Sequence, residues 1–144
     1  MRTKALTKVQ VIRRYDAPAD RVFDAFLDPT KAAKFMFATK TGQMIRAEID
    51  AKVGGSFVFI DRRPNGDAEH YGTYLEINRP RRLAFTFAVQ KDAAESDPVT
   101  IDITARGKGC EVVLVHEMDA KFVAYKDKII EGWNGILGGL ATTL

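Results

Sequence analysis

Two histidines and a single cysteine are the side chains of this sequence best suited to metal binding or nucleophilic catalysis. Cys110 and His116 fall on one predicted strand, and His70 lies far from both along the chain. The spacings typical of zinc sites, such as Cys-x-x-Cys or His-Glu-x-x-His, do not occur, and no base stands near Cys110 to activate its thiol. The sequence therefore predicts no metal site, no cofactor and no catalytic cysteine.

Carboxylates could instead act as general acids or bases. Asp61, Asp102 and Glu117 are the candidates, and we interpret all three as charges at strand ends or on the outward face of a strand. His116 is more informative, because it shares the strand phase of Leu114 and so points toward the interior near one end. A histidine in such a place is typical of a hydrogen-bonded structural group, so the sequence predicts no catalytic residue.

Composition and charge exclude several classes of function. The net charge is +3 at pH 7 and the pI is about 9.0, which is only mildly basic. The arginine clusters at 13–14, 62–63 and 79–82 are separated in sequence, whereas nucleic-acid binding needs a continuous basic face. No apolar run approaches the roughly 20 residues of a membrane span, and no secretory signal is present. A single cysteine fits a reducing compartment. We expect a cytoplasmic protein that neither binds nucleic acid nor spans a membrane.

The elements that must position these residues follow from the period of the apolar side chains. Residues 8–15 predict a strand. A helix then begins at Pro18, with Asp16 or Ala17 as its cap, and a second short helix begins after Asp28, which we expect to cap it. The chain therefore opens with one strand and two helices.

From Met44 onward the apolar period changes to two, which predicts about six antiparallel strands. The segments "PNGD" and "RGKG" are typical of hairpin turns, and we place Asn65 and Gly66 at the tip of the first. A sheet with one apolar face must be covered, and the C-terminal segment is the long amphipathic helix available for it. With 144 residues, we predict a single α+β domain over residues 1–144.

The C-terminal helix carries an unusual set of glycines. Its apolar stripe includes Trp133, and Gly132, Gly135 and Gly139 lie along one edge of that stripe. Each glycine costs about 1 kcal/mol relative to alanine in a helix interior. We therefore expect another backbone to approach closely along this edge, or space beside the helix to stay open, as it would if a curved sheet closed round the helix.

Four segments carry a resemblance to a known family: "APADRVFDAFLDP", "VGGSFVF", "YGTYLEINRPRRLAFTF" and "GWNGILGGL". In order and spacing, from about Val9 to Leu140, they resemble the START-like (Bet v-like) helix-grip superfamily, often called SRPBCC. They are most similar to its branch named for the activator of the 90-kDa heat-shock protein ATPase, the Aha-type homologues. The resemblance implies a curved antiparallel sheet of about six or seven strands wrapped round a long C-terminal helix, with two short helices after the first strand and often a deep apolar cavity.

Two departures from the family pattern affect what can be carried over. Phe35 stands where many relatives of this branch have tryptophan, which would change the mouth of the cavity. The eukaryotic co-chaperones that gave the branch its name carry a further N-terminal domain, whereas this sequence opens directly on the grip region. The resemblance therefore does not by itself imply co-chaperone activity.

Aromatic residues on the inner face are the predicted ligand-binding set, because apolar pockets are lined in this way. Tyr71 and Tyr74 point to opposite faces of their strand, and we favour Tyr74 because it shares a phase with Gly72. The predicted set is Phe35, Phe57, Phe59, Tyr74, Phe85, Phe87, His116 and Trp133.

Three functions remain open on the sequence. The leading hypothesis is a domain that binds an apolar or amphipathic small molecule between the sheet and the C-terminal helix. An alternative is a chaperone-associated protein-interaction module, like the heat-shock ATPase activators. A further alternative is a cyclase or hydrolase acting on a bulky apolar substrate, which would need two or more titratable groups in the cavity. We predict that the protein is not an enzyme; the sequence names neither the ligand nor a chaperone partner, and it leaves a homodimer open.

Overall fold

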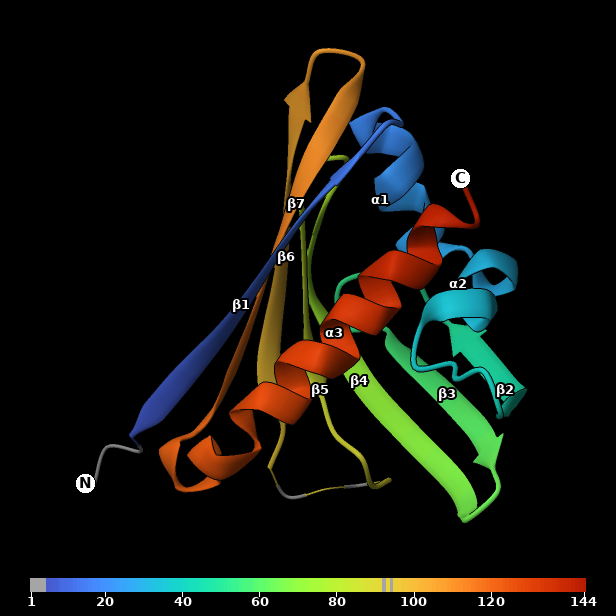
Figure 1. The fold of residues 1–144 in the computed structure, drawn as a ribbon, viewed down its shortest axis with the longest axis vertical. Helices are drawn as coiled ribbons and strands as arrows, with labels where there is room; N and C mark the ends of the chain where they lie inside the picture. Colours follow the sequence, from blue (N-terminus) through green and yellow to red (C-terminus); the bar gives the residue numbers. More distant parts are fainter. Residues whose placement is uncertain (1–4, 92, 94) are drawn as a thin grey trace.

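The computed structural model describes residues 5–91, 93 and 95–144 (Figure 1). The chain opens with strand β1 (Leu6–Tyr15) and helices α1 (Ala19–Leu27) and α2 (Pro29–Phe35). Six strands follow: β2 (Gln43–Ile49), β3 (Ser56–Arg63), β4 (Gly66–Asn78), β5 (Arg82–Phe87), β6 (Asp97–Arg106) and β7 (Gly109–Asp119). A short 3-10 helix, η1 (Ala120–Tyr125), leads into the C-terminal helix α3 (Lys126–Ala141).

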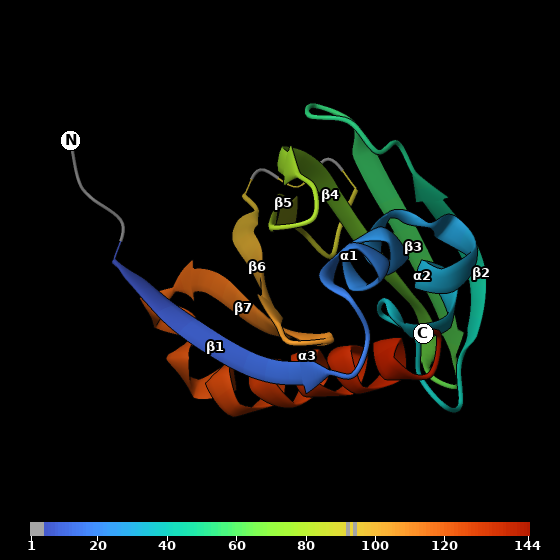
Figure 2. The same ribbon diagram turned by 90° about the horizontal axis from the view of Figure 1, so that it is seen from above.

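The seven strands form one antiparallel sheet in the order β1-β7-β6-β5-β4-β3-β2. The sheet is strongly curved, and α3 lies across the open side of the curve with α1 and α2 beside its C-terminal end (Figures 1 and 2). This confirms the predicted α+β helix-grip fold. No helix in the described part of the chain is long and apolar enough to span a membrane.

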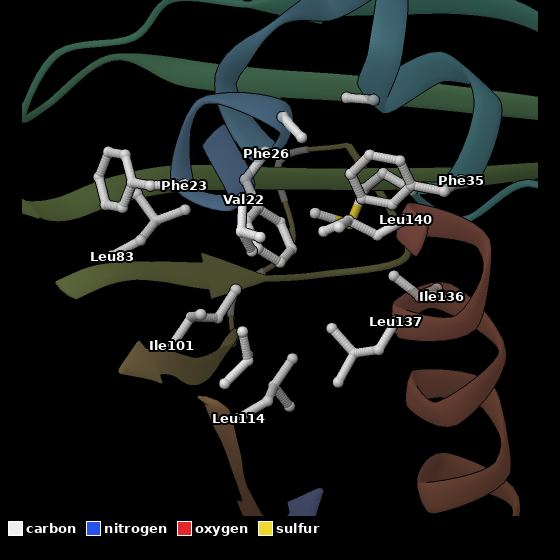
Figure 3. Packing of buried hydrophobic residues seen from close by; sticks show 14 of the residues in the cluster. Val22, Phe23, Phe26, Phe35, Leu83, Ile101, Leu114, Ile136, Leu137 and Leu140 are labelled. Carbon is white, nitrogen blue, oxygen red and sulfur yellow. The ribbon is translucent and has the colours of Figure 1, made fainter. Parts of the chain in front are cut away.

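The core fills the space between the sheet, α1 and α2, and the C-terminal half of α3 (Figure 3). Phe23 and Phe26 on α1 and Leu137 and Leu140 on α3 are almost completely buried there. A polar contact joins the same layers, because the Tyr15 hydroxyl of β1 donates to the Leu137 carbonyl oxygen at 2.6 Å. This end of the grip is therefore solid.

The first residues of α1 and α2 test the predicted helix caps. The Asp28 carboxylate accepts from the backbone nitrogens of Thr30 and Lys31, so the predicted cap of α2 is confirmed. The prediction for α1 is wrong: Pro18 is its cap residue, and no side chain caps the helix, since the proline ring carries no hydrogen-bond acceptor.

The hairpin between β3 and β4 lies one residue earlier than predicted. Arg63 pairs with Gly66, so the loop consists of Pro64 and Asn65. Gly66 has a φ of +125°, a backbone conformation that side chains disfavour. The glycine is therefore required at the first residue of β4 and not at the tip.

The glycines of α3 differ in their surroundings. A Cβ atom on Gly139 would lie 3.0 Å from the Phe35 Cβ, so α2 approaches α3 closely there, as expected. A Cβ on Gly132 or Gly135 would meet nothing within 4 Å. Gly132 borders the pocket described below, whereas Gly135 is exposed on the surface. The expectation that each glycine meets a nearby backbone or borders an open space beside the helix is therefore wrong for Gly135.

This difference predicts opposite effects of the same substitution. We expect Gly139→Leu to lower the free energy of unfolding by about 1–3 kcal/mol, because the side chain would overpack against Phe35. Gly135→Leu should raise it by a fraction of about 1 kcal/mol, since leucine is the better helix former. Chemical denaturation of both variants measures the changes. A gain of stability in both would show that α2 does not constrain this edge of the helix.

Candidate ligand-binding pocket

A pocket of about 470 Å³ lies beyond the solid core, between the N-terminal half of α3 and the sheet. Val89, at 62% exposure, lies at its rim, and Trp133, at 3%, lies at its floor. Residues from seven segments of the chain surround it. They are Phe37, Ala38, Thr39, Arg63, His70, Phe87, Val89, Asp97, His116, Ile129, Gly132, Trp133 and Ile136.

Aromatic rings form one wall of the pocket. His70 on β4 and Phe87 on β5 hold their rings within 11° of parallel, with centroids 6.0 Å apart. The Phe37 ring stacks over both, at 4.2 Å from His70 and 5.1 Å from Phe87. Trp133 meets Phe37 and Phe87 edge-on. Stacked and edge-on arrangements are the favourable geometries for aromatic pairs, so this wall is well ordered and largely apolar.

His70 is neutral in this wall. Its Nδ1 lies 3.2 Å from the Phe59 carbonyl oxygen, which can only accept, so Nδ1 carries the proton and Nε2 is left as an acceptor. Burial lowers the pKa of His70 to about 4, and the nearby Arg63 charge acts in the same direction, against the hydrogen bond to Phe59. The pocket therefore contains a histidine that stays uncharged near neutral pH.

His116 joins three elements through its two ring nitrogens. The Trp133 indole N–H of α3 donates to Nδ1 at 2.9 Å, which leaves the proton on Nε2. Nε2 lies 2.9 Å from an oxygen of Asp97, at the start of β6, and donates to it. A carboxylate–histidine pair is an arrangement that catalysis uses for a general base, but here the indole occupies the nitrogen that would take the proton. The prediction of a buried, hydrogen-bonded His116 is confirmed.

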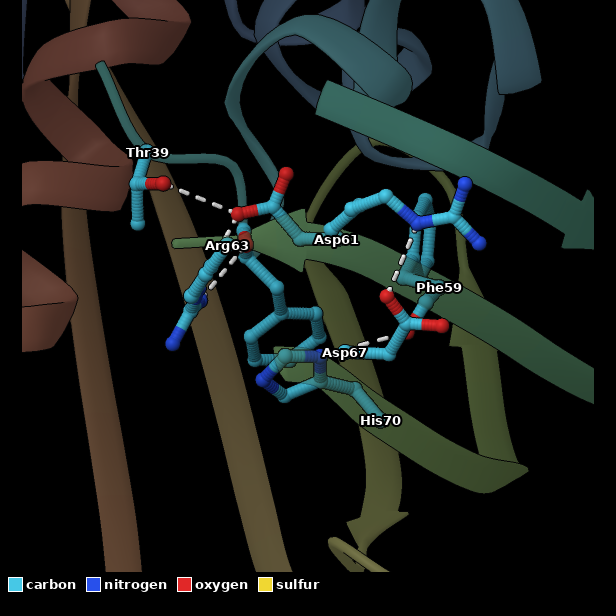
Figure 4. Close-up of polar contacts among 8 residues, drawn as sticks. Thr39, Phe59, Asp61, Arg63, Asp67 and His70 are labelled. Atoms are coloured by element: carbon cyan, nitrogen blue, oxygen red, sulfur yellow. Dashed lines mark hydrogen bonds and ion pairs between the residues drawn. The ribbon is translucent and has the colours of Figure 1, made fainter. Parts of the chain in front are cut away.

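Asp61 is buried, so its interpretation as a surface charge is wrong. It follows Phe59 by two residues on β3 and therefore points to the same inner face. One carboxylate oxygen accepts from Thr39 Oγ1 at 2.9 Å and from Arg63 Nε at 3.0 Å (Figure 4). The other has no partner within the described part of the chain. Asp102 and Glu117 keep exposed or half-exposed side chains, as predicted.

The family model for the Activator of Hsp90 ATPase homolog 1-like proteins matches residues 16–144. The chain belongs to this family. The resemblance to the Aha-type branch is thereby confirmed, and no curated protein matches the chain.

Solved structures similar to this Aha-type protein come from several bacteria. Protein CV1439 from Chromobacterium violaceum is 24% identical, with a TM-score of 0.82 over 94% of each chain. Protein SA2116 from Staphylococcus aureus is 14% identical, with a TM-score of 0.85 over 97% of this chain and 94% of that one. The AHSA1-like protein from Aeromonas hydrophila is 19% identical, with a TM-score of 0.79 over 95% and 91%. At these identities the likeness shows the fold.

The predicted ligand-binding residues of this Aha-type domain fall into two groups. Phe87, His116 and Trp133 line the pocket. Phe57, Phe59, Tyr74 and Phe85 instead surround an inner void of only about 10 Å³, together with Phe26, Met36 and Leu83. Phe35 packs edge-on against Phe26 and lines neither space. Their role in binding stays a prediction.

Sequence reasoning missed several residues of the pocket. His70 shares the strand phase of Tyr74, and Asp61 shares that of Phe59, so the alternation already applied to their neighbours would have placed both inside. Phe37 lies in the connection between α2 and β2, where no period operates, and nothing in the sequence distinguishes it.

Metal and thiol chemistry have little support in the described residues. Over residues 5–91, 93 and 95–144, no group of three or more His, Cys, Asp or Glu side chains gathers as metal ligands would. Cys110 is buried, and burial raises the pKa of its thiol, which disfavours the reactive thiolate.

The neutral His70 predicts a pH dependence of stability. Its pKa is about 4 in the folded protein and 6.5 in the unfolded chain. Between these values the unfolded chain binds more protons, so the free energy of unfolding should fall as the pH is lowered through this window. His70→Phe keeps a ring in the stack and removes the titration. Urea denaturation at several pH values should therefore show a smaller loss in the variant; equal losses would mean that His70 titrates normally.

The Trp133–His116 hydrogen bond predicts non-additive effects. His116→Leu and Trp133→Phe should each lower the free energy of unfolding by about 1–3 kcal/mol, because each leaves a buried partner unsatisfied. The double variant removes both partners, so its cost should be smaller than the sum, with a coupling of about 0.5–3 kcal/mol. Additive costs from denaturation curves would show that the two side chains do not interact.

Proposed function

We propose that this Aha-type domain binds a small apolar or amphipathic molecule in the pocket between α3 and the sheet. The observation that carries the proposal is the pocket itself. Its volume of about 470 Å³ lies within the roughly 300–1,000 Å³ of small-molecule sites, which combine apolar walls with few polar groups. Phe37, Phe87, Trp133 and Ile136 supply such walls.

The polar groups of the pocket indicate the kind of head group that it would accept. Arg63 uses Nε for Asp61 and Nη2 for the Phe37 carbonyl oxygen, which leaves Nη1 free of these bonds. Asp97 accepts from His116, and its side chain is 35% exposed. A donor and an acceptor therefore border the same space, together with the acceptor Nε2 of His70. A neutral group that both donates and accepts, such as a hydroxyl or an amide, matches these partners best.

Binding without turnover is part of the proposal. A base facing the pocket would need a free nitrogen of suitable pKa. His116 has both nitrogens engaged, and His70 has a pKa of about 4, so it is a weak base. These observations favour a carrier or sensor of a ligand over a cyclase or hydrolase.

A protein-interaction module is the second candidate. Phe122, Val123 and Tyr125 on η1 are each at least 44% exposed. Leu6, the first residue of β1, is also exposed, and the Ala5 carbonyl oxygen next to it accepts from the Ala120 backbone nitrogen of η1. None of these four exposed apolar side chains lines the pocket. Addition of the protein to a 90-kDa heat-shock ATPase tests this reading, and an unchanged ATPase rate would count against it.

Two glycines on one helix provide a matched test of the pocket. Gly132→Leu places a side chain in open space at the pocket wall, whereas Gly135→Leu points to solvent on the same helix. We expect Gly132→Leu to weaken binding of the neutral dye Nile red at least about tenfold, equivalent to 1.4 kcal/mol. Gly135→Leu should bind within about twofold of the unsubstituted protein.

Fluorescence titration measures the three affinities, and denaturation curves confirm that both variants are folded. Equal dye binding by all three proteins would place the dye elsewhere and contradict the proposal. Absence of binding to the unsubstituted protein would contradict it as well.

A further inference from the structure

Phe37 has an unusual backbone for a large residue. Its φ is +59°, in the left-handed region, which is rare for bulky side chains because of steric strain. The side chain is nevertheless buried, at 6% exposure. Strained residues persist where their surroundings hold them in place, and they are common at ligand clamps and switches. The contacts of Phe37 therefore need an explanation.

The Phe37 ring separates two aromatic spaces. On its outer side it stacks on His70 and Phe87, which line the pocket. On its inner side the Phe37 ring packs against Phe57 and Phe59, with ring centroids 6.3 Å and 5.9 Å away. Both of these residues line the inner void.

The chain itself crosses this boundary between consecutive residues. Met36 lines the inner void, and Phe37 lines the pocket. The ring therefore packs between the lining of the void of about 10 Å³ and the lining of the pocket of about 470 Å³.

Side-chain bonds hold the Phe37 segment against β3. Arg63 Nη2 donates to the Phe37 carbonyl oxygen at 3.1 Å, and Thr39 Oγ1 donates to Asp61 (Figure 4). Asp61 also accepts from Arg63 Nε, so these bonds form one latch. The latch is incomplete, since the second Asp61 oxygen is buried without a partner within the described residues. A segment held by a few side-chain bonds can open locally without unfolding the sheet.

We propose that Phe37 is a gate, and that the inner aromatic space is a hidden extension of the ligand site. The extension takes the end of a single apolar chain whose neutral polar head stays near Arg63 and Asp97. Displacement of one phenyl ring would free space for an alkyl chain and not for a fused polycycle. The inference deepens the proposed function and rests on it, because the alkyl chain of the ligand would enter from the outer pocket.

Methyl NMR with 1-hexanol and 1-decanol distinguishes the two spaces. Ile129 and Ile136 report on the outer pocket, Met36 reports on the inner space, and the exposed Ile12 of β1 is the control. We expect 1-hexanol to shift the Ile129 and Ile136 signals alone. 1-Decanol should shift these and the Met36 signal, while Ile12 stays unchanged with both alcohols.

The variant Phe37→Ala removes the gate. It should raise the affinity for 1-decanol at least about tenfold and that for 1-hexanol less than about threefold, since each methylene that reaches the inner space adds about fourfold. The substitution frees the space of a phenyl ring among apolar side chains, and apolar cavities made by large-to-small substitutions accept apolar guests. The measurement in the unsubstituted protein stands on its own if the variant folds poorly.

The outcomes separate this inference from the proposed function. If both alcohols shift only Ile129 and Ile136, and Phe37→Ala affects their affinities equally, the outer pocket binds ligand and the gate is wrong. If neither alcohol shifts any of these methyl signals in either protein, the proposed function fails and the gate fails with it.

Discussion

One concave apolar sheet face covered by one long helix is the constraint on which this structure depends. Seven strands curve so strongly that α1, α2 and the C-terminal half of α3 fill the space at one end. Neither α1 nor α2 lies beneath the N-terminal half of α3, and rings from the sheet and from Phe37 pack against it instead. The pocket is the part of this space that the rings do not fill. It results from a mismatch in length between a long sheet and the two short helices.

Two buried hydrogen bonds fix α3 over the sheet. In the C-terminal half of the helix the Tyr15 hydroxyl of β1 donates to the Leu137 carbonyl oxygen, and at the middle of the helix the Trp133 indole donates to His116 of β7. Hydrogen bonds in such buried places are costly to break. They set the position of the helix along two strands, and with it the width of the pocket. Tyr15 and His116 therefore position the helix, and the Trp133 indole occupies the His116 nitrogen that a general base would need.

The sequence predicted the fold and the inner face well, because both depend on periodic burial. The period of two placed Phe57, Phe59 and Tyr74 inside, and the same period would have placed Asp61 and His70 there. The general preference of charged groups for water argued against Asp61, and local partners override that preference here. The gap in the packing was not predictable, because no periodic signal indicates which of several inward rings touch one another. The inward position of Phe37 and the exposure of Gly135 are set by tertiary packing alone, which leaves no periodic signal in the sequence.

The strand order has a consequence for how the chain folds. Every neighbouring pair from β2 to β7 is consecutive in sequence, whereas β1 pairs with β7, and Leu6 lies opposite Asp119. Contacts of such large sequence separation close a long loop and are slow to form. We expect the six-strand meander to assemble first and β1 to complete the sheet late. Tyr15 lies on β1, so the anchor of α3 to this strand would also form late, and pulsed amide exchange during refolding would reveal that order. The pocket would then take its final shape only once β1 has joined the sheet.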